Sequence, residues 1–134
     1  TDGTECMVVH NGSGDLMTVK LEDGTDRVEQ ASAEKPLSYH VSCQNRLRPG
    51  YAYVSGAYDA GGTGKYMYRE IYAVKLDGTG SVERFGQGVF DASSPTGPQA
   101  LASPYGDIVI MKSTWKSASN NRAYAMYVPE TMPA

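Results

Sequence analysis

One segment of the chain occurs twice, and this repetition limits the possible folds more than any other sequence feature. Residues 16–29, Leu-Met-Thr-Val-Lys-Leu-Glu-Asp-Gly-Thr-Asp-Arg-Val-Glu, return as residues 71–84, Ile-Tyr-Ala-Val-Lys-Leu-Asp-Gly-Thr-Gly-Ser-Val-Glu-Arg. Val19 aligns with Val74 at an offset of 55 positions, and Val28 aligns with Val82 at an offset of 54, so the alignment places a one-residue deletion in the turn. Each copy has the pattern of a strand, an Asp-Gly turn and a second strand, which predicts an array of repeated β-units.

The composition favours β-structure throughout. The 134 residues include 15 Gly, 7 Pro and 10 Tyr, a mixture that suits many short strands joined by turns. The net charge of −3 disfavours nonspecific nucleic-acid binding, which needs a basic surface. No stretch approaches the roughly 20 apolar residues that cross a bilayer as a helix. We therefore expect an all-β protein of one domain's size.

The strand pattern divides residues 1–134 into three blade-like units that together form a single segment. The units cover approximately residues 4–30, 38–85 and 98–128 and contain about ten strands. The first unit lacks an initial strand and the third lacks a final one, whereas the second is a complete four-stranded antiparallel sheet. Four-stranded antiparallel sheets arranged radially are the blades of a β-propeller.

Several details of this pattern can be checked against a structure. Met17, Val19 and Leu21 alternate along one side of their strand, which predicts that this side is the half-buried one. Residues 26–30 are expected to form a polar outer strand, and residues 66–76 a long strand. The two cysteines, Cys6 and Cys43, lie in apolar contexts that favour buried free thiols, although one disulfide between them is possible.

Specific residues resemble a known family. Residues 103–113, Ser-Pro-Tyr-Gly-Asp-Ile-Val-Ile-Met-Lys-Ser, resemble the Ser-Pro-Asp-Gly-Lys hairpin of the TolB-type, WD-repeat-like Pro-Asp propeller repeats of bacteria. Residues 71–80 resemble the strand and turn that follow this hairpin, and residues 40–55 resemble a variant blade. Tyr105 replaces the usual Asp, so the Asp side-chain bond to the turn backbone is expected to be missing there.

The resemblance implies a larger closed structure. Propellers of this type close with six to eight blades, and the last blade usually takes a strand from the other terminus. Three blades cannot close a ring, so the chain is expected to be the carboxy-terminal part of a larger propeller, or a subunit completed by identical chains. Because the sequence starts at Thr1 without Met, we also expect that a segment precedes it. The expected partners are the remaining blades or identical subunits.

The candidate binding residues lie mainly on the strands expected to line the central channel. His40 alternates with Ser38 and Ser42, and Gln99 lies on the equivalent strand of the third unit. Oligogalacturonate lyases, which the propeller type resembles distantly, hold a divalent metal through several His and a Gln. This chain supplies only His10, His40 and Gln99, so such a site needs ligands from other blades. A hydrogen-bonded channel histidine is the simpler interpretation.

Other candidates are basic, aromatic or acidic. Arg48 belongs to a basic group with Arg46 and Lys65 that is interpreted as a solvated loop or, alternatively, a polyanion site. Trp115 could stack on a sugar, as could Tyr51, Tyr53, Tyr58, Tyr66 and Tyr68, although packing explains many such aromatics. The acidic residues that cluster in hairpin turns are explained by turn formation: Glu22, Asp23, Asp26 and Asp77. No catalytic or metal-binding set is assigned.

The sequence therefore leads to two hypotheses. The first is a non-catalytic propeller segment that binds a protein or glycan or builds an assembly, with candidate binding residues His40, Ser42, Arg48, Gln99 and Trp115 and no cofactor. The alternative is part of a metal-dependent polysaccharide lyase, of the oligogalacturonate type, whose site other blades complete with a divalent metal. The composition, with few Lys and many Ser, Tyr and Gly, indicates a periplasmic or secreted location.

Overall fold

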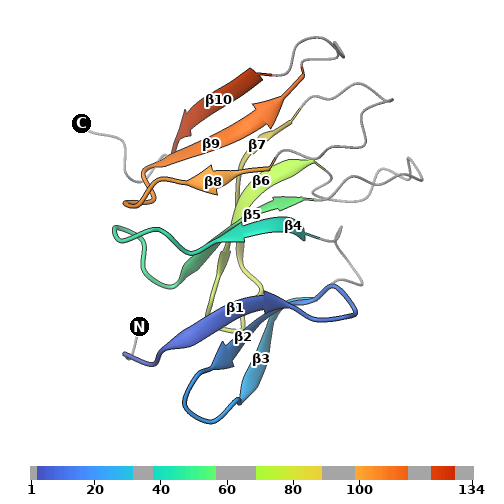
Figure 1. The fold of residues 1–134 in the computed structure, drawn as a ribbon, viewed down its shortest axis with the longest axis vertical. Coiled ribbons are helices and arrows are strands. Elements are labelled where there is room, and N and C mark those ends of the chain that lie inside the picture. The colour runs from blue at the N-terminus through green and yellow to red at the C-terminus, as the bar shows by residue number, and fades with distance from the viewer. Residues whose placement is uncertain (1–2, 32–37, 57–68, 89–98, 115–121, 129–134) are drawn as a thin grey trace.

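The chain folds into three antiparallel β-sheets (Figure 1). The computed structural model describes residues 3–31, 38–56, 69–88, 99–114 and 122–128, and these contain ten strands and no helix. The all-β prediction is confirmed. The first sheet contains β1 (Cys6–His10), β2 (Leu16–Lys20) and β3 (Asp26–Gln30); the second contains β4 (Ser38–Ser42), β5 (Tyr51–Gly56), β6 (Glu70–Lys75) and β7 (Val82–Gln87); the third contains β8 (Leu101–Ala102), β9 (Ile108–Ser113) and β10 (Arg122–Tyr127).

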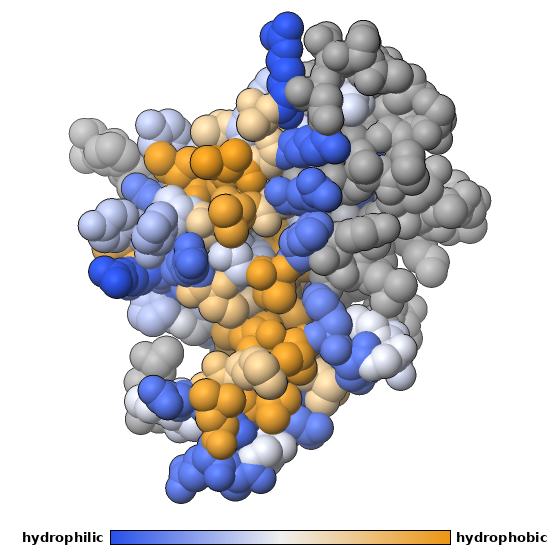
Figure 2. Space-filling model, viewed as in Figure 1, coloured by the Kyte–Doolittle hydropathy of each residue, from blue (hydrophilic) through white to orange (hydrophobic). Residues whose placement is uncertain are grey.

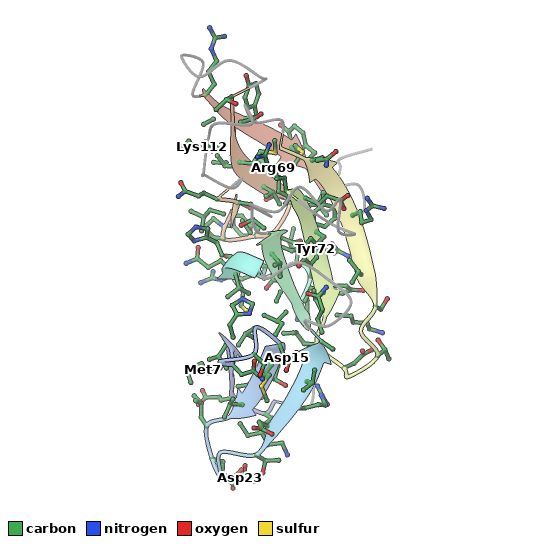
Figure 3. The ribbon with its side chains drawn as sticks, turned by 90° about the vertical axis from the view of Figure 1, so that its right-hand side faces the viewer. Met7, Asp15, Asp23, Arg69, Tyr72 and Lys112 are labelled. Carbon is green, nitrogen blue, oxygen red and sulfur yellow. The ribbon has the colours of Figure 1, made fainter. Side chains whose placement is uncertain are left out.

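The three sheets are stacked face to face, with the second sheet in the middle (Figure 1). One apolar core lies between the first and second sheets and includes Leu16, Val54, Tyr72 and Val74. A second core lies between the second and third sheets and includes Tyr53, Ile71, Ala73, Val109 and Met111. Consecutive residues of β6 alternate between the two cores because side chains of a strand point to opposite faces. In Figure 3, Tyr72 lies among interior side chains, whereas Met7 and Lys112 lie at the margin.

The two similar hairpins have the same pairing pattern, but it differs from the sequence alignment. In the first hairpin Met17 pairs with Val28, and in the second Tyr72 pairs with Arg84. Val82, which the sequence aligns with Val28, instead pairs with Val74 and therefore occupies the place of Asp26. The turn of the second hairpin is one residue longer because Lys20 N bonds Thr25 O, whereas Lys75 N bonds Ser81 O. The predicted one-residue deletion in the second turn is therefore wrong, because that turn contains one residue more than the first.

A β-bulge interrupts both hairpins at the corresponding place. The register shifts between Leu16 and Met17 in the first and between Ile71 and Tyr72 in the second. As a result, Glu29 and Phe85 are the extra residues of β3 and β7. A bulge bends its strand and redirects the extra side chain. Glu29 and Gln30 are buried, so the prediction of a polar outer strand holds for the edge position of β3 but not for its last two side chains.

β2 is buried on both sides near its start, so the predicted side is only one of two. Leu16 is 1% exposed and packs against the second sheet, and Met17 on the predicted side is 9% exposed, whereas Leu21, beyond the end of β2, is 59% exposed. Both faces of this strand carry apolar residues, so alternation alone does not distinguish them. The long strand expected over residues 66–76 spans Glu70–Lys75, and residues 57–68 lie outside the described part of the chain.

Side-chain hydrogen bonds fix the turns. Asp23 Oδ1 accepts a bond from Thr25 N at 2.8 Å, and Asp77 Oδ1 accepts one from Thr79 N at 3.0 Å, which confirms the turn role predicted for both. In the third sheet, Ser103 bonds the turn that contains Tyr105. Its Oγ accepts from Gly106 N at 3.1 Å and donates to Asp107 at 2.6 Å.

Candidate functional site

The predicted channel residues lie along one side of the stack. His40 is exposed on β4 and pairs with Ser55, while Ser42 is buried and pairs with Tyr53. Both therefore lie on the face of the second sheet that is directed toward the third sheet. β4 is a neighbour of β8, and the exposed Gln99 precedes β8 by two positions. The structure thus brings His40, Ser42 and Gln99 to the same side of the molecule.

Arg48 is not part of a solvated loop. It is 5% exposed, forms an ion pair with Glu83 of β7, and places its guanidinium carbon 4.4 Å from the centre of the Tyr51 ring. Burial lowers its pKa, but the Glu83 carboxylate and Tyr53 outweigh this effect and raise it. The interpretation as a solvated basic group is therefore wrong for Arg48, because its guanidinium is buried and pairs with Glu83 of the second sheet. Arg46 is exposed, and Lys65 lies outside the described residues.

The tyrosines considered for sugar stacking have different surroundings. Tyr53 is 2% exposed, donates a hydrogen bond from its hydroxyl to Gly106 O at 2.6 Å, and contacts Phe85 edge to face at 5.5 Å. Burial raises the pKa of Tyr53. Tyr51 lies under the guanidinium of Arg48. Both rings are therefore packing residues, while Trp115, Tyr58, Tyr66 and Tyr68 lie outside the described residues.

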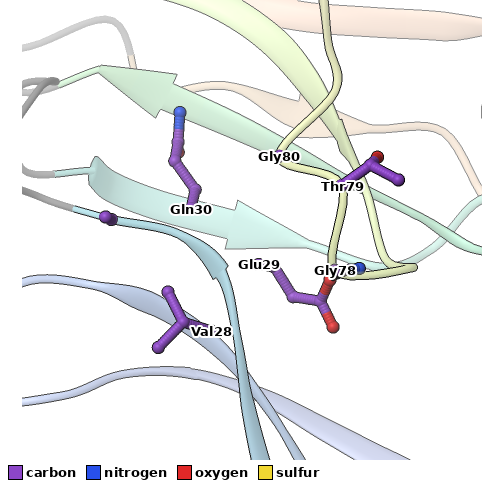
Figure 4. A pocket seen from close by; sticks show the side chains of 7 residues that line it. Val28, Glu29, Gln30, Gly78, Thr79 and Gly80 are labelled. Atoms are coloured by element: carbon purple, nitrogen blue, oxygen red, sulfur yellow. Dashed lines mark hydrogen bonds between the residues drawn. The ribbon is translucent and has the colours of Figure 1, made fainter.

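A buried carboxylate at the boundary between the first and second sheets was missed by sequence reasoning. Glu29 is 2% exposed, and its Oε1 accepts hydrogen bonds from Thr18 Oγ1 at 2.6 Å and from Arg27 at 2.7 and 2.9 Å. Its Oε2 accepts from Gly78 N in the turn of the second sheet at 2.7 Å. Glu29 and Gly78 line a polar hollow of about 300 Å³, and Figure 4 shows the Glu29 side chain directed toward Gly78. Because donors occupy both oxygens, this carboxylate ties the two sheets together.

A larger groove lies at the same boundary. It has a volume of about 720 Å³ and is called here the inter-sheet groove. Its lining includes Cys6, Val8 and Lys20 from the first sheet and Cys43, Leu76 and Asp77 from the second-sheet side. Both cysteines are exposed, so the prediction of buried thiols is wrong. The apolar residues that flank each cysteine do not bury it because both lie at strand ends.

The described residues contain no obvious catalytic centre. No group of three or more His, Cys, Asp or Glu side chains in this part of the chain is placed to hold a metal ion. The described residues also include no helix long and apolar enough to cross a membrane. The neighbouring Thr79 hydroxyl and Lys75 hold the pKa of Asp77 well below its usual range, but both interactions belong to the turn.

Comparison with protein-family models, with curated proteins and with solved structures gives no match.

Proposed function

We propose that the chain is a non-catalytic β-propeller segment that acts as a protein- or glycan-binding or structural assembly module in an extracytoplasmic compartment. The observation that carries the proposal is the stack itself, in which antiparallel sheets of three, four and three strands pack face to face. Blades of a propeller pack in this manner around a central axis.

Strand direction supports this interpretation. The loop after β4 bonds the turn after β8, from Arg46 N to Pro104 O and from Leu47 N to Tyr105 O, so β4 and β8 end on the same side. The start of β1 lies with the end of β4, because Cys6 and Cys43 line one groove. β1 therefore runs opposite to β4 and β8. The first sheet accordingly lacks a counterpart of β4 and β8 among the described residues, as expected for an incomplete blade.

The outer faces of the stack are apolar. On the first sheet, cross-strand pairing aligns Val9, Met17 and Val28 on the face directed away from the second sheet, where Val28 is 43% exposed and Met17 is 9% exposed. On the third sheet, pairing aligns Leu101 and Ile110, which are 58% and 49% exposed. Figure 2 shows a further hydrophobic band that runs down the viewed face, across the edges of the three stacked sheets. Such exposed faces favour covering by further sheets.

The mass of the purified chain in solution tests the proposal. Light scattering after size-exclusion chromatography is expected to give particles that are multiples of 14.4 kDa. Ile110→Asp and Val28→Asp should shift the particles toward the monomer, because each places a charge on an outer face. Leu47→Asp is the matched control, since Leu47 is 60% exposed in a loop rather than on an outer face. A monodisperse 14.4-kDa monomer of the unmodified chain would contradict the proposal.

Metal analysis separates this proposal from the polysaccharide-lyase alternative. A divalent metal bound to the purified particle and lost in His40→Ala would favour the enzyme, because His40 is the exposed histidine on β4. The binding module instead predicts equal and negligible metal content in both proteins. The extracytoplasmic location can be examined by fractionating cells that produce the natural protein.

A further inference from the structure

The alternation of side chains places the two cysteines on facing sides of one boundary. Val8 of β1 and Val41 of β4 both pack into the core between the first and second sheets. Cys6 precedes Val8 by two positions, and Cys43 follows Val41 by two positions. Because side chains two positions apart in a strand share a face, Cys6 of β1 is directed toward the second sheet, and Cys43, the first residue after β4, lines the groove between the two sheets.

The opposite directions of the strands bring the two cysteines to the same end of the boundary. β1 and β4 are neighbours in the stack and run in opposite directions (Figure 1). A step of two residues back along β1 and a step of two residues forward along β4 lead in the same spatial direction, about 7 Å from the valine pair. Both steps end in the inter-sheet groove, which Cys6 and Cys43 line together. Both thiols are free and exposed to reagents.

We propose that Cys6 and Cys43 form a reversible disulfide that joins the first and second sheets. The thiolate of one cysteine attacks a small-molecule disulfide, forms a mixed disulfide and releases one small thiol. The second cysteine then attacks the mixed disulfide and releases the other small thiol. The two protein thiols are thus oxidised to one disulfide, and the small disulfide is reduced to two thiols that carry the two protons. An excess of small thiol reverses both steps.

The disulfide has a direct structural consequence. Cys6 and Cys43 are 37 positions apart, and this interval contains the connection between the first and second sheets. A cross-link over such an interval restricts the unfolded chain and is expected to raise the Tm by about 10 °C. The first sheet would then stay attached to the second even when the apolar core between them opens.

The test uses the purified chain equilibrated with oxidised glutathione and then with an excess of reduced glutathione. After oxidation, mass spectrometry of the intact chain should show a loss of about 2 Da, the mass of two hydrogens. Protease digestion should yield one cross-linked peptide pair containing Cys6 and Cys43. The Tm should rise with oxidation and return with reduction.

Matched variants make the result decisive. Cys6→Ser and Cys43→Ser should each take up one glutathione, form no internal cross-link and show no rise in Tm. Alkylation under denaturing conditions should count two free thiols in the reduced wild-type chain and none in the oxidised one. Oxidised wild-type chain that carries two glutathione adducts, or that forms only cross-linked dimers on a non-reducing gel, would overturn the proposal.

Discussion

Glu29 and Phe85 occupy the same position in two hairpins, yet they face different neighbours. Each is the extra residue of a β-bulge, and each projects from its own sheet toward the next sheet in the chain. Glu29 accepts hydrogen bonds from both sides of the first boundary, whereas Phe85 packs into the apolar core of the second boundary and contacts Tyr53 of its own sheet. The backbone therefore fixes where the side chain projects, while the residue type decides whether it forms hydrogen bonds across the boundary or packs in an apolar core.

The largest effect is expected at the first boundary. Glu29→Ala removes the acceptor of Thr18, Arg27 and Gly78 and should lower the free energy of unfolding by about 4 kcal/mol. Urea denaturation measures this change, and Glu22→Ala is the matched control because Glu22 is exposed in a turn. A loss as small as that of the control would mean that the carboxylate does not tie the sheets.

The second boundary should be less sensitive to one truncation. Phe85→Ala removes the edge-to-face contact with Tyr53 and should cost about 2.5 kcal/mol, below the value for a fully enclosed ring because Phe85 is partly exposed. The same denaturation experiment measures it. Tyr105→Ala removes a ring that is 56% exposed and should be nearly neutral. Equal losses of unfolding free energy for Glu29→Ala and Phe85→Ala would remove the contrast between the two boundaries.

A single hydroxyl also crosses the second boundary. Tyr53→Phe removes the bond to Gly106 O in the third sheet's turn while keeping the ring, and should cost about 1.5 kcal/mol because a buried carbonyl loses its partner. Tyr127→Phe is the control, since Tyr127 is 58% exposed. A neutral Tyr53→Phe variant would show that ring packing alone holds this turn.

The smallest expected effect is a pH dependence in the first sheet. Burial lowers the pKa of His10 from 6.5, so the unfolded chain binds a proton more readily than the folded one just below pH 6.5. Stability should therefore fall as the pH drops below 6.5. The Tm of the wild-type chain should decline more steeply in this window than that of His10→Gln. Parallel pH profiles would contradict the prediction.

The sequence predicts the strands well and the contacts between sheets poorly. Alternating apolar residues and turn signals such as Asp77-Gly78 locate the hairpins, because these signals are local. The burial of Glu29 depends on a bulge and on Gly78, which lies 49 positions away. The burial of Arg48 similarly depends on Glu83, which lies 35 positions away. No local pattern contains such information.

In the candidate site too, local patterns predict strand faces but not contacts between distant residues. The alternation of Ser38, His40 and Ser42 is a local property, and the structure has His40 and Ser42 on the face of β4 directed toward the third sheet. The exposure of the cysteines is not local: Cys6 and Cys43 lie in apolar stretches that indicate burial, but the stretches end where the sheets diverge into the inter-sheet groove. The opposite directions of β1 and β4, rather than the local composition, place both thiols in the inter-sheet groove.

The burial of β6 determines which backbone amides are best protected from hydrogen exchange. Its residues from Glu70 to Val74 are buried because sheets cover both faces and strands flank both edges. Backbone amides in such a position exchange with solvent only when the whole stack opens, whereas those of the edge strands β1 and β10 exchange through local fraying. Hydrogen exchange within β6 therefore reports complete opening, and its slowest amides give the free energy of that opening.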